Sequence, residues 1–110
     1  MKRYHPAEAA RSAVSVAPDR PAVSVLHDAD EGRLVIFRIA PGQKVAEHTS
    51  TSHVFLTILS GTGYVTGAEG ERPVGSGEVL AIAPREPHGM RADGNELVLA
   101  AFITPRPGNR

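Results

Sequence analysis

The sequence predicts an all-β protein, a small antiparallel barrel or sandwich. Turn signals rich in glycine, proline, aspartate and asparagine recur roughly every 8–12 residues along the chain, as in such folds. The runs between them are short and apolar, and no stretch after the N-terminal segment keeps a helical period. A chain of 110 residues suffices for one domain with its own core.

The composition excludes several classes of function. Twelve basic residues balance twelve acidic ones, so no net field draws the chain to nucleic acid or to a membrane surface. The absence of cysteine excludes disulfides, thiolate metal ligands and a cysteine nucleophile. The first residues lack the apolar core of a signal peptide, and no apolar run is long enough to cross a bilayer. We therefore expect a cytoplasmic protein.

Residues 1–32 are expected to form an N-terminal arm and the first strands. Residues 7–13 fit a helical turn, and the two Val-Ser-Val segments at 14–16 and 23–25 could pair as a hairpin. An arm that crosses to a partner subunit is equally open. Residues 28–32 are expected to form a loop.

The barrel itself is expected over residues 33–104, followed by a frayed tail at 105–110. Its strands are expected at residues 33–40, 44–47, 54–59, 64–66, 78–83, a short segment from 88, and 96–104. Glycine-rich turns at 60–63 and 93–95 are expected to reverse the chain between strands.

Some strands are apolar on both faces, which predicts a partner. One face of a barrel strand fills the interior, and the other must be covered by a second sheet or another subunit. Phe37, Phe55, Leu59 and Phe102 exceed what one interior needs, so we expect a homodimer that buries them. The alternative is that neighbouring loops cover these side chains.

Three histidines lie where strands begin. His48 and His53 head one apolar run, and His88 follows a proline-rich loop. In a rolled barrel such positions can lie side by side, and imidazole nitrogen suits Fe, Mn, Zn, Ni and Cu ions. Two protein ligands make a weak metal site, whereas three with open positions make a catalytic one. The other histidines, His5 and His27, are expected on the surface.

The spacing around these histidines resembles two motifs of the cupin family. In the first motif, G-x5-H-x-H-x(3,4)-E-x6-G, Gly42, His48 and Gly61 are correctly placed. In the second, G-x5-P-x-G-x2-H-x3-N, Gly77 and His88 stand at the required separation. The chain thus resembles a small single-domain cupin over about residues 33–104, which implies an antiparallel double-stranded β-helix, or jelly-roll barrel.

The departures from the motifs fall on the metal ligands. The second histidine position of the first motif is Ser50, and its glutamate position is Val54. The proline, glycine and asparagine of the second motif fall on Ala83, Arg85 and Ala92.

The resemblance implies a divalent metal ion at His48 and His88, and we expect the nearby His53 as the third ligand. His53 stands one residue before the glutamate position, so strict alternation turns it to the opposite face, and a bulge would be needed to turn it inward.

Two functions follow from this reading. The first is a metal-dependent dioxygenase or isomerase that acts on a small organic molecule, as the resemblance implies. The alternative is a non-catalytic barrel that binds or senses a small molecule and has a degenerate metal site. The sequence does not choose between them, and it identifies no catalytic residue.

Overall fold

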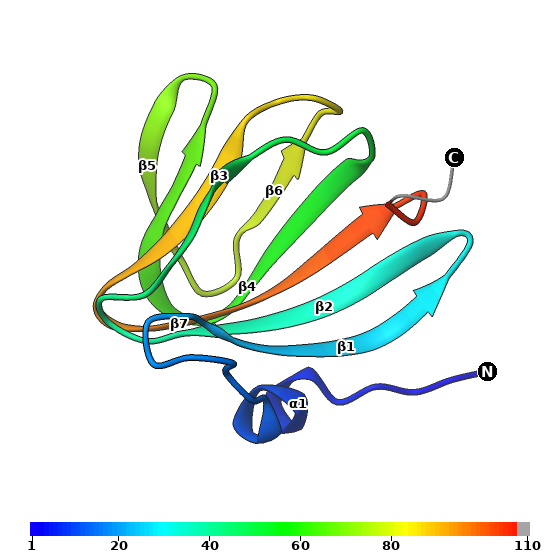
Figure 1. The fold of residues 1–110 in the computed structure, drawn as a ribbon, viewed down its shortest axis with the longest axis horizontal. Coiled ribbons are helices and arrows are strands. Elements are labelled where there is room, and N and C mark those ends of the chain that lie inside the picture. The colour runs from blue at the N-terminus through cyan, green and yellow to red at the C-terminus, as the bar shows by residue number, and fades with distance from the viewer. Residues whose placement is uncertain (108–110) are drawn as a thin grey trace.

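Two long antiparallel strands, β4 (His53–Gly67) and β7 (His88–Thr104), organise the protein (Figure 1). The computed structural model describes residues 1–107. The remaining elements are α1 (Pro6–Ser12), β1 (Ala22–Ala29), β2 (Gly32–Ile39), β3 (Lys44–His48), β5 (Gly70–Gly75) and β6 (Val79–Ile82).

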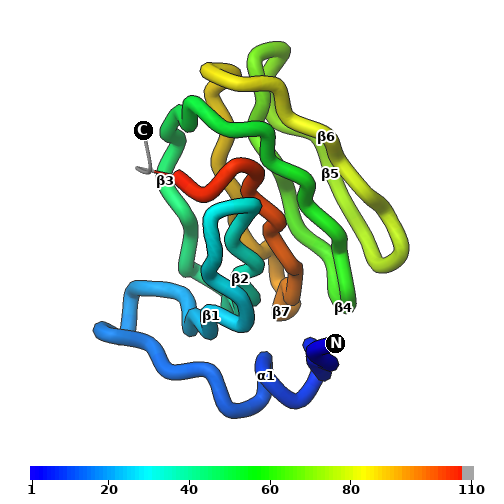
Figure 2. Tube along the Cα trace, turned by 90° about the vertical axis from the view of Figure 1, so that its right-hand side faces the viewer, coloured from blue at the N-terminus to red at the C-terminus, as the bar shows by residue number. Residues whose placement is uncertain are grey.

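The sheet rolls up because each long strand pairs with different neighbours along its length. The first half of β4 pairs with β6 and its second half with β5. Likewise, the first half of β7 pairs with β3 and its last half with β2, which in turn pairs with β1. From the side, β3 lies on one side of the roll and β5 and β6 on the other (Figure 2). This arrangement confirms the expected antiparallel double-stranded β-helix, or jelly-roll barrel.

The expected chain reversals at residues 60–63 and 93–95 are wrong. Both segments lie inside continuous strands, and the pairing of β4 with β7 shifts register between Ile58 and Ser60 and between Gly61 and Gly63. Gly61 has a φ of 83°, and a Cβ there would lie 1.8 Å from the carbonyl oxygen of Glu96. The glycine permits a bend in a strand at a bulge, where we expected a turn between two strands.

Other boundaries also differ from expectation. The loop expected at residues 28–32 shrinks to two residues because β1 and β2 pair as far as Ala29 and Gly32. Strand β5 was not expected, since its sequence contains one buried apolar residue, Val74, and a proline. Proline is tolerated there because β5 is an edge strand.

The barrel interior holds the main core. Alternate residues of β4, such as Val54, Leu56 and Ile58, point inward and are almost fully buried. They pack with Val65 from the second half of β4 and with inward residues of β2, β5, β6 and β7, which are Ile39, Val74, Ile82, Met90, Ala92, Leu97, Leu99 and Ala101.

A second, smaller core lies on the outer face under α1. Ala10 of the helix packs with Ile36, Val98 and Ala100 of the sheet. Arg38 holds the end of the helix, because its guanidinium donates to the carbonyl oxygens of Ala10 (2.8 Å) and Ala13 (3.2 Å). Residues 6–12 thus form the helix that this segment fitted. The hairpin, which was one of two open alternatives for residues 14–16 and 23–25, is reduced to one bridge between Val14 and Val23.

The four apolar residues behind the homodimer prediction occupy different places. Phe37 lines the interior, and Leu59 packs against the core under α1. Phe55 and Phe102, which pair across β4 and β7, are exposed on the outer face, with 38% and 37% of their surface accessible. Of the four, only Phe55 and Phe102 form the exposed apolar surface that we expected a partner subunit to cover. The homodimer stays a prediction.

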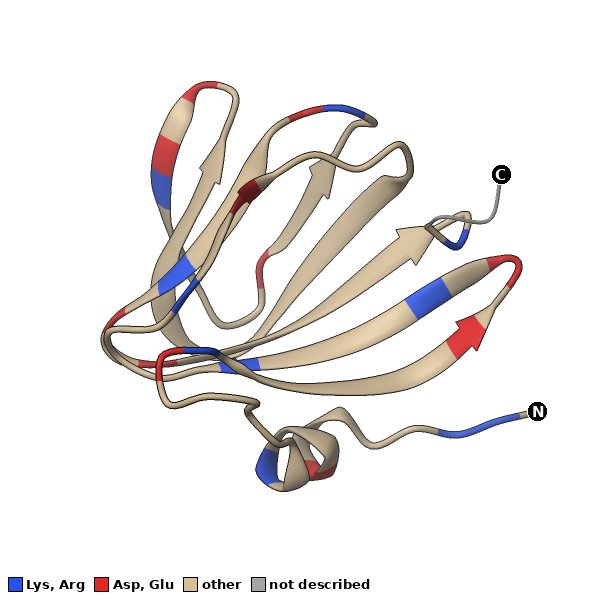
Figure 3. Ribbon diagram, viewed as in Figure 1, with Lys and Arg blue, Asp and Glu red and all other residues tan. Residues whose placement is uncertain are grey.

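Charged residues of both signs are mixed over the molecule (Figure 3). No helix within residues 1–107 has the length and apolar character needed to span a membrane.

Candidate metal and ligand site in the barrel

A cavity of about 230 Å³ opens between the two halves of the barrel. Most of its lining is apolar, and its polar groups gather where β3 ends and β7 begins. The lining residues are Phe37, Val45, His48, Thr49, Ser50, Val54, Leu56, His88, Met90, Ala101, Ile103 and Pro107.

The two histidines singled out by the motif spacing lie together at this cavity. His48 ends β3 and pairs directly with His88, the first residue of β7. Their ring centroids are 4.3 Å apart and the ring planes are inclined by 55°. His88 is 3% exposed, whereas His48 is exposed on the edge strand. The pair thus joins the cavity interior to solvent.

Backbone hydrogen bonds fix the orientation of both rings. Nδ1 of His48 donates to the carbonyl oxygen of Ala46 (3.0 Å), and Nδ1 of His88 donates to that of Glu86 (2.9 Å). Because a carbonyl oxygen only accepts, the neutral ring carries its proton on Nδ1 and its lone pair on Nε2. Metal-binding histidines are typically oriented by such a bond from the other ring nitrogen.

His53 does not join this pair. It begins β4 on the face opposite to Val54, is exposed, and does not line the cavity. The pairing of His53 with Thr104 and of Val54 with Ile103 continues without a register shift, so there is no bulge to turn the imidazole inward. The expected ligand set of His48, His53 and His88 is therefore not assembled by this geometry.

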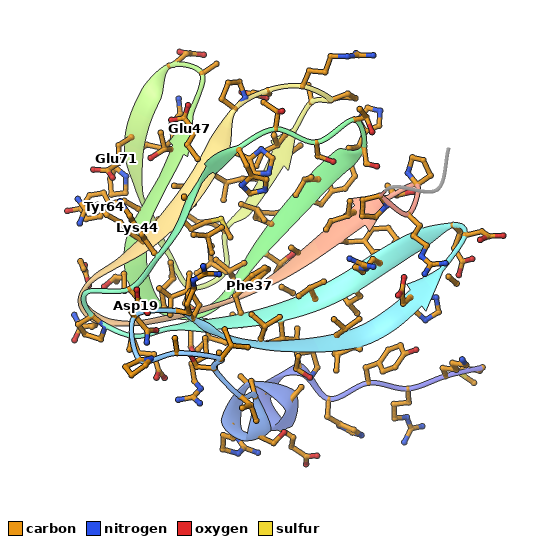
Figure 4. All side chains as sticks on the ribbon, in the orientation of Figure 1. Asp19, Phe37, Lys44, Glu47, Tyr64 and Glu71 are labelled. Atoms are coloured by element: carbon orange, nitrogen blue, oxygen red, sulfur yellow. The ribbon has the colours of Figure 1, made fainter. Side chains whose placement is uncertain are left out.

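The carboxylates that are close to the histidines in sequence, Glu47 and Glu86, also lie elsewhere. Glu47 lies on the same side of the molecule as Glu71 (Figure 4), and both line a depression on the outer face of the sheet. Arg91 belongs to the same lining. Glu86 accepts a hydrogen bond from the backbone N–H of Ala83 (3.0 Å) and borders another hollow between β5 and β6. Neither carboxylate lines the histidine cavity.

The outer depression is held by an ordered ion pair. Arg91 donates to both carboxylate oxygens of Glu71 (2.8 and 2.9 Å) and lies 4.2 Å from the centre of the Tyr64 ring. The hydrogen bond from Arg91 lowers the pKa of the Glu71 carboxyl below its ordinary value. These groups stabilise the outer face and do not reach the histidine pair.

The available donors fit a divalent ion only in part. Two imidazole nitrogens suit Zn, Cu, Ni, Fe or Mn, and the hydroxyls of Thr49 and Ser50 lie in the same lining. No cluster of three histidine, cysteine or acidic side chains that could hold a metal occurs within residues 1–107. An ion at His48 and His88 would therefore need further donors from water or from a bound molecule.

Arg85 marks the place of the second-motif glycine. It has a φ of 66°, and no other residue except glycine has a positive φ in the described chain. Its backbone N–H donates to the carbonyl oxygen of Ser50 (2.7 Å), which ties together the loops that carry the two histidines. The backbone thus keeps the left-handed turn of the motif although the side chain has changed.

Sequence reasoning missed the role of the C-terminal segment. The expected frayed tail is wrong for residues 105–107; residues 108–110 lie outside the described chain. The buried Ser52 hydroxyl donates to the carbonyl oxygen of Pro105 (2.7 Å), and Arg106 forms an ion pair with Asp28 (2.8 Å). Pro107 can therefore serve as a wall of the cavity. The two prolines of the C-terminal segment were the only feature of its sequence that could have indicated order, and prolines do not identify a contact surface.

The other two histidines behave differently from each other. His5 is exposed, as expected. His27 is more than a surface residue, because Nδ1 accepts a hydrogen bond from the Tyr4 hydroxyl (2.7 Å) and Nε2 donates to Glu31 (2.8 Å). These bonds tie the N-terminal arm to the turn between β1 and β2.

The rolled antiparallel sheet defines a double-stranded β-helix protein, and in this chain a histidine pair lies at the cavity in its interior. The family model described as "Cupin domain" matches residues 35–104. The chain belongs to the cupin family. A search of curated protein sequences finds no match.

Solved structures with the same fold cover nearly the whole chain. An uncharacterised protein with a double-stranded β-helix domain from Klebsiella pneumoniae superposes with a TM-score of 0.83 at 20% identity, over 99% of this chain and 92% of that one. An RmlC-like cupin from Desulfovibrio desulfuricans gives 0.79 at 24% identity, over 96% and 98%. A polyketide cyclase from Streptomyces resistomycificus gives 0.78 at 20% identity, over 98% and 82%. At these identities the likeness establishes the fold.

Proposed function

We propose that the chain binds a divalent metal ion through Nε2 of His48 and Nε2 of His88, and takes a small organic molecule into the cavity beneath them. The observation that carries this proposal is the orientation of the two rings. Each Nδ1 donates its proton to a backbone carbonyl oxygen, so the free lone pair of each ring is on Nε2. The two rings are in contact, so their Nε2 lone pairs are available to one metal ion.

Different residues of the cavity would bind the ion and the organic molecule. The two imidazoles would hold the ion, and the hydroxyls of Thr49 and Ser50 could bind polar atoms of the molecule. The apolar walls would exclude water from its body. The ion would act as a Lewis acid on an oxygen atom of the bound molecule.

The finer form of the proposal is a metal-dependent dioxygenase or isomerase. Membership of the cupin family supports it. No carboxylate lines the cavity to act as a general base, so the metal would have to supply the chemistry.

Metal titration of the full chain tests this site. Isothermal titration calorimetry with Ni²⁺ or Zn²⁺ should show one ion per chain for the wild type, and loss of binding for His88→Ala and for His48→Ala. His53→Ala is the matched control and should bind as the wild type does. Unchanged stoichiometry in His88→Ala would remove this residue from the site.

A specific observation favours a second candidate, a non-catalytic binding barrel. The glutamate position of the family motif holds Val54, which is buried and apolar, and its second histidine position holds Ser50. Such a barrel would bind its organic ligand equally well with and without EDTA. The metal-dependent protein would lose that ligand when the ion is chelated.

A further inference from the structure

A second hollow adjoins the histidine cavity. It lies between β1 with the segment before it and β3, and has a volume of about 510 Å³. We call it the seam groove. Its apolar lining includes Val14, Val16, Val23, Phe37 and Val45.

The seam groove concentrates exposed apolar surface in one place. Val14, Val16 and Val23 are 74%, 88% and 39% exposed. Val23 pairs with Phe37 across β1 and β2, so both side chains project from the face that forms the barrel interior. Single exposed valines are ordinary on a protein surface, whereas several that gather in a hollow mark a binding surface.

The groove lies beside the histidine cavity and shares part of its lining. Phe37 and Val45 line both spaces, and Phe37 lies inside the rolled sheet (Figure 4). An apolar chain held at the histidines could therefore pass these two side chains and lie against the valines. The cavity of about 230 Å³ exceeds the roughly 150 Å³ that accommodates benzene, and the groove more than doubles the space.

The distribution of polar groups restricts the ligand to one polar head. Within the histidine cavity the polar side chains are the two histidines with Thr49 and Ser50, and no charged acidic or basic side chain belongs to its lining. A molecule with many hydroxyl groups would bury them against apolar walls without partners, which is costly. Asp19, Arg20 and Lys44 belong to the lining of the groove, and none of these charged side chains lines the histidine cavity.

We propose that the site takes a single-headed amphiphile. Its head, with oxygen or nitrogen donors, lies at His48 and His88, and its apolar chain extends past Phe37 and Val45 into the seam groove. This proposal rests on the proposed function, because the head occupies the same histidine pair.

A homologous series of ligands tests the length of the apolar path. The probes are n-alkyl hydroxamates, from acetohydroxamate to decanohydroxamate, titrated by calorimetry into the Ni²⁺-loaded full chain. Affinity should rise about threefold to fourfold with each added methylene, and should keep rising after the histidine cavity is full. A plateau after the shorter members would overturn the proposal.

Substitution of one groove valine provides the matched test. Val16→Asp should weaken octano- and decanohydroxamate by about tenfold or more while leaving acetohydroxamate unchanged, since only the long chains reach the groove. Val79→Asp is the control, because Val79 is 63% exposed on β6, away from the groove. If Val16→Asp lacks the wild-type circular dichroism spectrum, Val16→Ser answers the same question. An equal effect on short and long probes would contradict the proposal.

Two further readouts separate the possible failures. Titration with Ni²⁺ alone reports on the histidine pair. If the protein binds no Ni²⁺ but its affinity for the hydroxamates still rises with each added methylene, the proposed function is wrong and the proposal of an amphiphilic ligand stands. Normal metal binding with a flat series defeats the amphiphile alone. A third result also overturns the proposal: the affinity is the same for all hydroxamates, and light scattering shows a wild-type dimer that Val16→Asp dissociates. The groove would then be the contact surface for a second copy of the chain.

Discussion

Replacing Arg85 with glycine should stabilise the protein. Arg85 has a φ of 66°, in the left-handed region where a Cβ approaches the neighbouring carbonyl oxygen. Its side chain is exposed and forms no ion pair among those found in the described residues. The hydrogen bond from its backbone N–H to Ser50 would remain, because glycine has the same donor.

The size of the gain follows from two opposing terms. Relief of the left-handed conformation contributes about 1–2 kcal/mol. The greater freedom of glycine in the unfolded chain costs about 0.4–1 kcal/mol. The net increase in the free energy of unfolding is therefore about 0–1.6 kcal/mol, with a midpoint of about 0.8 kcal/mol. The midpoint corresponds to a rise of several degrees in Tm for a domain of this size.

The assay is urea denaturation followed by circular dichroism, since the chain has no tryptophan. Arg85→Ala keeps a Cβ and should gain nothing, which separates the backbone from the side chain. Arg72→Gly, in strand β5, should lose about 0.5–1 kcal/mol because glycine is unfavourable in a strand. If Arg85→Gly is destabilised, or Arg85→Ala gains as much, the strain argument is wrong.

Two further predictions concern the barrel frame. Gly61→Ala should cost more than about 3 kcal/mol, because the backbone of Gly61 is left-handed and the new Cβ would meet the Glu96 carbonyl oxygen. Gly94→Ala, with open space around it, should change the urea midpoint little. Glu71→Gln should lower stability near neutral pH and have no effect in acid. The hydrogen bond from Arg91 lowers the folded-state pKa of Glu71, so its stabilising contribution is present above the ordinary carboxyl range and is lost as the pH falls through the lowered value. A Glu71→Gln difference that persists unchanged in acid would refute this assignment.

The sequence predicted the class of fold because the periodic features of a barrel are local. Alternation in segments such as Val54–Leu59 marks the buried face without knowledge of its partners. The two long strands were missed because a glycine such as Gly61 is used both where a chain reverses and where a strand bends. Only the pairing of β4 with β7 on both sides of the bend distinguishes these cases.

The site was predictable to the extent that motif spacing fixes it. His48 and His88 pair across β3 and β7, as their separations from the motif glycines led us to expect. The position of His53 depended on whether β4 begins with a bulge, which no residue type reveals. Pro107 could not be foreseen, because its place in the lining depends on bonds from distant residues to the segment before it.

The position of Pro107 affects how the protein should be prepared. A polyhistidine tag fused after residue 110 would begin three residues from a wall of the cavity, and its imidazoles would compete with His48 and His88 for any added metal. The N-terminal arm instead leads to α1 on the outer face of the sheet (Figure 1). A cleavable N-terminal tag is therefore the appropriate choice for every metal and ligand measurement on this barrel.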